Sequence, residues 1–207
     1  RDGEALSVLE VELRELGAMT TAVAGIDIAN AQAVFDAAAL FAERLGPIDI
    51  WVNDAMVTVF SPVAEITPEE YKRVTEVTYL GVVYGSMAAL RHMRPLRRGQ
   101  IINVGSALAY RGIPLQAAYC GAKHGIRAFT AALRTELEGE SMPITLTMTE
   151  LPAMNTPQFD WGRTHMAHEP KPMGKIYEPE AAAEAVYRAT QTHAHEYWVG
   201  LSTILTI

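Results

Sequence analysis

The chain has 207 residues, 49% of them hydrophobic, and a formal net charge of −7. This size and apolar content fit one domain with a sizeable core. The negative charge argues against a nucleic-acid-binding protein, because phosphate backbones are bound through clustered Lys and Arg. No apolar run approaches the about 18 residues that span a bilayer, and the single cysteine allows no internal disulfide, so we expect a soluble, cytoplasmic protein without membrane contact.

The first half of the chain alternates helical patterns with apolar, β-rich runs, as repeated βαβ units do. The run at 48–53 is rich enough in Ile, Trp and Val to be buried on both faces. Thr67 is expected to cap a long helix whose first turn holds Pro68, and Glu70 completes a capping box. Before that helix, we predict helices over 5–16, ending at Gly17, and 31–45, and strands over 21–28 and 48–53.

The second half continues the same alternation. It predicts strands over 100–104, 144–149 and 197–199, and helices over 117–138 and from Pro179 onward. The segment 153–177 has no clear period, which is typical of a lid or substrate wall. The whole indicates a single domain over 1–207, a doubly wound, Rossmann-like α/β fold. Such sheets bind ligands beyond the carboxyl ends of their strands, so Asn53, Ser106 and Pro152 should line one crevice.

Tyr119 and Lys123 lie four residues apart near the start of a predicted helix, so their side chains share one face. A free tyrosine has a pKa of about 10, and a nearby ammonium group lowers it toward the range useful for proton transfer. Ser106, at a strand end, would hold a substrate oxygen against the phenol. The alternative reading of the pair alone is a packed Tyr with a surface Lys.

The segment QIINVGS ending at Ser106, followed by YCGAK from Tyr119 to Lys123, resembles the active-site segment of the short-chain dehydrogenase/reductase family in residues and spacing. Other matches follow in the family's order along the chain. They are Asp27-Ile28 for the Asp-Val that touches adenine, Val52-Asn53-Asp54-Ala55 for Asn-Asn-Ala-Gly, and Leu151-Pro152-Ala153 through Thr156 for Pro-Gly…Thr.

The resemblance implies an oxidoreductase that moves a hydride between NAD(P) and a carbonyl or secondary alcohol, a small-molecule substrate. Tyr119 would be the general acid/base, Ser106 would orient the substrate oxygen, and Lys123 would also bind the nicotinamide ribose. The remaining cofactor contacts would come from Asp27, Ile28, Asn53, Asp54, Ala55, Pro152, Ala153 and Thr156. Arg1 falls where the family often has an Arg against the 2′-phosphate, which favours NADP over NAD. The family also implies a homodimer or homotetramer built on the long helix and the Tyr119 helix.

The chain departs from the family's pattern in three places. The opening strand, Gly-rich turn and helix that receive the pyrophosphate are absent, so the sheet is expected to lack a strand between those ending at Asp27 and Asn53. Either the parent protein has that segment before Arg1, or this is a truncated, inactive form. Met56 replaces a glycine where backbone approaches the cofactor. Thr78 replaces an Asn of the proton relay, although its hydroxyl can bond a carbonyl one turn back.

Two other functions remain open on this fold. One is a non-catalytic, cofactor-sensing or scaffold protein, which Met56, Thr78 and the missing front would suit. The other is an epimerase or dehydratase relative, which uses Tyr and Lys but retains its cofactor.

Several features have simpler readings. The pairs His165 with His168 and His193 with His195 lack partner ligands at metal-binding spacing, so no metal site is expected. The basic stretch Arg91 to Arg98 reads as a solvated helix end rather than an anion site. Residues Met154, Trp161, Met166 and Met173 either form an adaptable apolar substrate wall or are ordinary loop packing.

Overall fold

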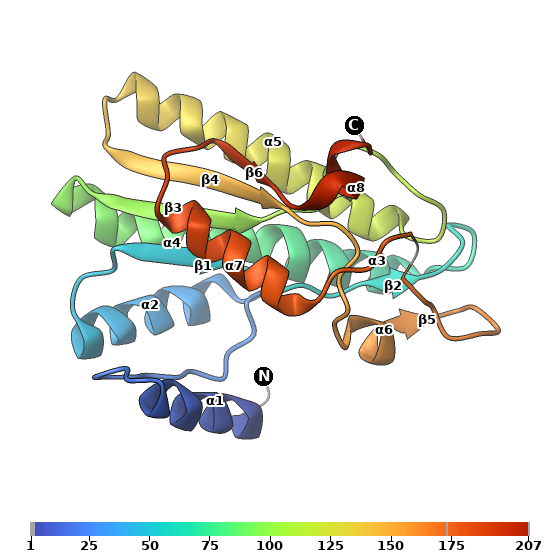
Figure 1. Ribbon diagram of the computed structural model, residues 1–207, viewed down its shortest axis with the longest axis horizontal. Coiled ribbons are helices and arrows are strands. Elements are labelled where there is room, and N and C mark those ends of the chain that lie inside the picture. The colour runs from blue at the N-terminus through green and yellow to red at the C-terminus, as the bar shows by residue number, and fades with distance from the viewer. Residues whose placement is uncertain (1–2, 173, 207) are drawn as a thin grey trace.

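The computed structural model describes residues 3–172 and 174–206 and contains a parallel, four-stranded sheet with helices on both faces (Figure 1). The strand order is β1-β3-β4-β6, and every neighbouring pair runs parallel. This confirms the predicted α/β fold with a parallel sheet. The strands are β1 (Ile50–Asn53), β3 (Gly99–Val104), β4 (Ile144–Glu150) and β6 (Glu196–Trp198).

Two long helices cover one face of the sheet and a third covers the other. Helices α4 (Gly81–Leu96) and α5 (Ala117–Gly139) pack on the first face, and α2 (Ala31–Leu45) packs against α4. Helix α7 (Pro179–Thr190) lies across β3 and β4 on the opposite side, in front of the sheet in Figure 1. The predicted bounds of α2 are confirmed, with Asn30 as N-cap and Gly46 as C-cap.

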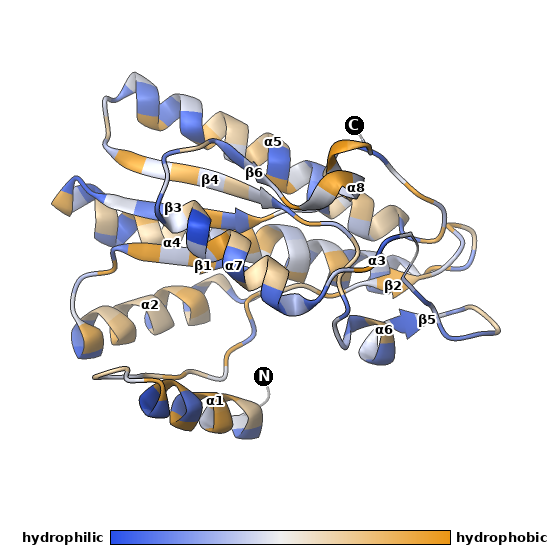
Figure 2. Cartoon of the chain, in the orientation of Figure 1, coloured by the Kyte–Doolittle hydropathy of each residue, from blue (hydrophilic) through white to orange (hydrophobic). Residues whose placement is uncertain are grey.

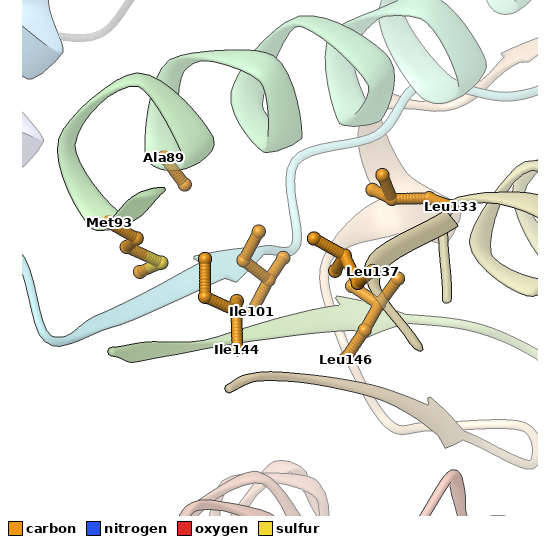
Figure 3. Packing of buried hydrophobic residues seen from close by; sticks show 7 residues of the cluster. All are labelled: Ala89, Met93, Ile101, Leu133, Leu137, Ile144 and Leu146. Atoms are coloured by element: carbon orange, nitrogen blue, oxygen red, sulfur yellow. The ribbon is translucent and has the colours of Figure 1, made fainter. Parts of the chain in front are cut away.

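The main core lies between the sheet and helices α4 and α5. Figure 3 shows its buried side chains, which come from α4, β3, α5 and β4. They are Ala89, Met93, Ile101, Leu133, Leu137, Ile144 and Leu146. Along β4, Ile144 and Leu146 belong to this core, and Met148 packs with Val82 of α4 and Ile126 of α5.

The sheet is less complete at β1. The strand predicted over 21–28 does not form, because a hollow lies between Ile26 and Ile28 and the free edge of β1, and this segment pairs with no described strand. Strand β1 therefore pairs with β3 alone, and Ile50 and Val52 remain 48% and 42% exposed. The prediction that this strand is buried on both faces is thus wrong. Figure 2 shows the resulting hydrophobic edge strand above α2.

Helix α1 (Gly3–Glu15) belongs to the same loosely packed side. It begins and ends close to the predicted limits, and Gly17 just beyond it has a φ of 99°. None of its residues is buried. Arg1, which was expected to contact the 2′-phosphate of NADP, lies outside the described residues.

The long helix that follows Thr67 is divided by a wider turn. The predicted capping box is present, since Glu70 N–H donates to Thr67 Oγ1 at 3.2 Å and Thr67 N–H to Glu70 Oε2 at 2.9 Å. After α3 (Pro68–Val74), the chain forms a π-helix, η1 (Thr75–Leu80), and then α4. Such wide turns change the direction in which helical side chains point, and Thr78 lies in this one.

Five short elements escaped the sequence prediction. Strands β2 (Val59–Phe60) and β5 (Arg163–Thr164) pair in parallel and fix part of the segment 153–177. The others are α6 (Gln158–Trp161), the 3-10 turn η2 (Ala107–Ala109) and α8 (Gly200–Ile204). Across the described ranges, we find no helix with the length and apolar character needed to cross a bilayer.

Candidate active site

A cavity of about 600 Å³ opens beyond the carboxyl ends of β3 and β4. Ser106 and Tyr119 both line it, and so do Pro152 and Ala153. Side chains from the N-terminal turn of α5 and from the ends of two strands thus meet at one hollow, as expected for an open α/β sheet. Asn53 is the exception, because it lines a different, smaller hollow.

Tyr119 lies in the first turn of α5, and its ring centroid is 5.6 Å from Lys123 Nζ. Burial raises the pKa of its phenol, and the nearby Ser106 hydroxyl opposes this only in part. The expectation of an acidified phenol is therefore wrong for this structure, because desolvation outweighs the favourable neighbours. Tyr119 retains its proton at neutral pH, which suits a group that donates one.

Ser106 follows the last residues of β3 and begins η2. Its hydroxyl oxygen accepts a hydrogen bond from the Leu108 N–H at 3.2 Å. Because the oxygen is used as an acceptor there, the O–H is free to turn toward the cavity and donate. Ser106 is thus oriented to hold an acceptor atom beside Tyr119.

Lys123 lies one turn after Tyr119 and is only 3% exposed. Its ammonium donates to the Val104 carbonyl at 2.6 Å, at the end of β3. Burial lowers its pKa to about 8, and the charges of Asp54 and Glu150 act in the opposite direction. The side chain is therefore an ammonium at neutral pH, although it releases its proton more readily than an ordinary lysine does.

Glu150 is a site residue that the sequence reasoning missed. It ends β4, is fully buried, and faces α5 with Leu146 and Met148. Burial raises the pKa of its carboxyl to about 7. The signal was in the alternation of β4, because a carboxylate occupies a position where the pattern calls for an apolar side chain.

Thr78 does not make the contact expected of it. Its hydroxyl donates to the Val57 carbonyl at 2.8 Å and accepts from the Val57 N–H at 3.0 Å. The expected bond to a carbonyl one turn back is therefore replaced by a link between η1 and the loop after β1. The π-helical turn carries Thr78 toward that loop. Its part in a proton relay stays a prediction.

A smaller cavity of about 160 Å³ adjoins β1 and is lined by Ile28, Asn53, Asp54 and Ala55, among others. The amide of Asn53 is engaged inside the protein: it accepts from Trp51 Nε1 at 2.8 Å and donates to Asn103 Oδ1 at 2.8 Å. Asn53 thus ties β1 to β3, and Asp54 and Ala55 are the exposed members of the group.

The other residues expected to hold a cofactor lie apart from these hollows. Asp27 Oδ1 accepts from Arg73 at 3.0 Å and from the Ala29 N–H at 3.1 Å. Thr156 is partly buried, does not line the large cavity, and bonds through its N–H to the Met154 carbonyl at 3.0 Å.

The expected substrate wall is formed only in part. Met166 lines the large cavity, but Met154 is buried and Trp161 is largely exposed. Met173 falls outside the described residues. The apolar wall comes instead from residues on several elements, notably Phe60, Leu108, Ile113, Leu115 and Phe159.

Neither the histidines nor the basic stretch forms a separate site in the part of the chain that the structure describes. No group of three or more potential metal ligands occurs there. His165 contacts the Glu70 carboxylate at 3.0 Å, beside an ion pair from Arg163. Arg94 pairs with Glu140 and Arg98 with Asp49 on the surface, so these cations are ordinary solvated partners.

The family model described as short chain dehydrogenase matches residues 1–165. An uncharacterized oxidoreductase of Bacillus subtilis, YxnA, is 32% identical over 202 residues, which are 97% of this chain and 56% of that protein. The inactive 2-(S)-hydroxypropyl-CoM dehydrogenase 2 of Xanthobacter autotrophicus is 30% identical, over 94% of this chain and 86% of that one.

Other comparisons agree on the fold. The L-2,3-butanediol dehydrogenase of Corynebacterium glutamicum is 34% identical over 61% of this chain and 50% of that protein. The chain thus spans about half the length of several curated relatives. A short-chain dehydrogenase structure from Streptomyces avermitilis superposes with a TM-score of 0.84 at 21% identity, covering 100% of this chain and 79% of that one.

Proposed function

Since the chain belongs to the short-chain dehydrogenase family, we propose that the protein is an NAD(P)-dependent oxidoreductase that interconverts a carbonyl compound and a secondary alcohol. One observation carries the proposal. Tyr119 and Ser106 line the same cavity, and the buried ammonium of Lys123 lies behind the tyrosine ring.

The proton chemistry follows from these three side chains. A substrate carbonyl oxygen accepts hydrogen bonds from the Ser106 hydroxyl and the Tyr119 phenol. As the carbonyl carbon is reduced, the phenol transfers its proton to that oxygen, and the Lys123 ammonium stabilises the phenolate that remains. In the reverse direction the phenolate removes the alcohol's proton. A nicotinamide, when bound, supplies or accepts the hydride.

The residues present fit the nicotinamide end of the cofactor. An ammonium has three donors, and the Val104 carbonyl takes one of those on Lys123, which leaves others for ribose hydroxyls. Pro152 and Ala153 lie at the cavity wall, where their backbone would meet the carboxamide. Asp54, Ala55 and Ile28, around the smaller cavity, would lie toward the adenosine. The described residues contain no Gly-rich turn that would bind the pyrophosphate. The position of Arg1 in the sequence is the one argument for NADP rather than NAD.

The cavity favours an apolar substrate. Its volume suits a small organic molecule, and its wall includes the stacked rings of Phe60 and Phe159, whose centroids are 5.7 Å apart. Polar and charged side chains also line the cavity, among them Gln116, Gln158, Glu169, Lys171 and Lys175, but apolar residues make up the larger part of the lining. We therefore expect aryl and cyclic ketones to react better than short keto acids.

The test is a turnover assay on the full-length parent protein. NADPH and NADH are each mixed with a panel of aryl ketones, cyclic ketones and short keto acids, and the loss of reduced nicotinamide absorbance is followed. We expect oxidation of NADPH, faster with the apolar ketones. Binding of NADPH without turnover of any carbonyl or alcohol would contradict the proposal.

A second candidate is a non-catalytic, cofactor-binding protein on the same fold. Thr78 is committed to Val57, and one relative is named an inactive dehydrogenase. Tight cofactor binding by calorimetry, without turnover and unchanged by Tyr119→Phe, would favour it. An epimerase or dehydratase would be excluded by net oxidation of added cofactor.

Two further predictions concern the intact protein. A homodimer or homotetramer would form through α4 and α5, and sedimentation of the full-length protein measures this. The cytoplasmic location expected from the single cysteine also stays a prediction.

A further inference from the structure

The carboxyl group of Glu150 is a buried titratable group to which the proposed reaction gives no role. Its side chain is fully buried, and within the described part of the chain neither oxygen makes a hydrogen bond of good geometry. The Ser106 N–H and the Tyr110 hydroxyl are nevertheless near enough to favour its ionised form. It packs against the Cα of Gly105, so closely that a side chain at that position would collide with Oε2. A glycine at the end of β3 therefore makes room for a carboxyl directly behind the catalytic segment.

Charged and titratable groups approach this carboxyl from each surrounding element. Helix α5 contributes Lys123 and Tyr119. Tyr110 approaches from the end of η2, and Glu196 approaches from β6. Tyr110 in turn lies under the Arg127 guanidinium, which is 4.1 Å from its ring centroid, and Asp54 acts on Lys123 from the loop after β1. Lys123 is the buried cation of the set.

Leaving an ionised carboxylate or an ammonium alone in a protein interior costs several kcal/mol, so such groups persist where each offsets the other. Lys123 and Glu150 meet this condition. Lys123, on α5, donates to the Val104 carbonyl at the end of β3, and the Glu150 carboxyl, at the end of the adjacent strand β4, packs against the next residue, Gly105. Each of the two charges also favours ionisation of the other.

We propose that Glu150 is a positioning residue, the counter-charge that keeps the Lys123 ammonium charged and directed at Val104 behind Tyr119. This rests on the proposed function, because it assigns a role within the same site. Glu150 lines neither cavity. It acts through Lys123 and, by its charge, holds the proton on Tyr119.

The direction of the effect follows from the charges. With the carboxylate removed, the Lys123 ammonium keeps the charge of Asp54 but loses the second charge that raises its pKa, and the phenol of Tyr119 loses one that raises its own. Both groups then release their protons at lower pH. Carbonyl reduction needs both groups in their protonated forms. In a variant without this carboxylate, the loss of activity at alkaline pH should therefore begin at a lower pH.

The kinetic experiment compares Glu150→Gln and Glu150→Asp with the parent protein. The matched control is Thr149→Val, which alters the neighbouring residue on the opposite face of β4, whose hydroxyl also has no partner. In Glu150→Gln the alkaline limb of the kcat/KM profile should move down by about one pH unit. Glu150→Asp should restore part of the shift, and Thr149→Val should leave the limb in place. An unmoved limb in Glu150→Gln overturns the proposal.

A second readout needs no turnover. Infrared difference spectroscopy follows the carbonyl band of the protonated carboxyl, which should disappear with a midpoint near pH 7 and be absent from Glu150→Gln. In Lys123→Met the midpoint should rise by about one pH unit or more, because the ammonium no longer favours ionisation. A midpoint that Lys123→Met leaves unchanged overturns the pairing. If these bands behave as expected while no ketone is reduced, the proposed function fails and the pairing stands.

Discussion

Two regions of the molecule differ in how completely they are packed. Around β3, β4 and α5, side chains such as Ile101, Ile126 and Leu146 are almost wholly buried. Around α1 and β1, no residue of the helix is buried and the strand exposes Ile50. The groups proposed for proton transfer all lie in the first region. Their geometry therefore depends on a closed core, while the cofactor-side contacts proposed near Asp54 depend on an open sheet edge.

The largest expected effect is the loss of the phenol in the packed region. Tyr119→Phe should reduce kcat by about 10²–10⁴-fold, the usual contribution of a positioned general acid. Tyr187→Phe, on the outer surface of α7 and 64% exposed, is the control and should leave kcat unchanged. Steady-state kinetics of carbonyl reduction measure both. Full activity in Tyr119→Phe would place the proton chemistry elsewhere.

Core truncation tests the difference in packing directly. Ile101→Ala should lower the free energy of unfolding by about 2–5 kcal/mol, because it leaves a cavity between the sheet and α4 and α5. Val11→Ala, in α1 and at a residue 55% exposed, should change it by less than about 0.5 kcal/mol. Urea unfolding of the two variants provides the comparison. Equal losses would show that α1 is packed as tightly as the core.

The buried carboxyl should make stability depend on pH. The pKa of Glu150 rises from 4.5 to about 7 in the folded protein, so its contribution to stability is complete below about pH 4.5 and is lost as the pH rises through 7. The loss should be roughly 3 kcal/mol, and Glu150→Gln should lack it. The burial of charged Lys123 also costs stability. This cost is relieved only above about pH 8, where Lys123 loses its proton, and so lies outside the pH range of Glu150. Thermal unfolding from pH 4 to 7 compares the two proteins, and parallel curves would refute the assignment.

The smallest effect is expected for an ion pair at the surface of the open region. Glu10 and Arg14 lie one turn apart in α1, with a 2.9 Å contact, and Glu10 also accepts from the Thr21 hydroxyl at 2.9 Å. Glu10→Gln should cost only about 0.3–0.5 kcal/mol, because solvent screens the pair. Urea unfolding at low and high salt would detect it, and a loss comparable with that of Ile101→Ala would contradict the proposed difference.

Local signals explain which elements were predicted correctly. Asn30 and Gly46 bracket α2, and Thr67 with Glu70 starts α3, because capping depends on residues a few positions apart. The strand expected over 21–28 failed for the opposite reason. A strand needs a neighbour, and pairing is a property of the sheet rather than of the segment.

The residues proposed for proton transfer were predictable from the sequence, but Glu150 and the electrostatics of the site were not. The spacing of Tyr119 and Lys123, and the strand end at Ser106, placed Tyr119 and Ser106 at one cavity with Lys123 beside them. Spacing does not report burial, however, and burial raises the pKa of the phenol that the pattern predicted to be acidic. Similarly, the wide turn around Thr78 redirects its hydroxyl to Val57, which an alignment of helical positions does not anticipate.

Transfer of label from the cofactor tests the proposed reaction most directly. The full-length protein is incubated with an aryl ketone and NADPH deuterated at the reactive nicotinamide carbon, and the alcohol is analysed by mass spectrometry. We predict that the alcohol gains a single deuterium with the parent protein and that Tyr119→Phe forms little of it. An absence of labelled alcohol with a protein that binds NADPH, or equal labelling by Tyr119→Phe, would contradict a reductase site built on Tyr119.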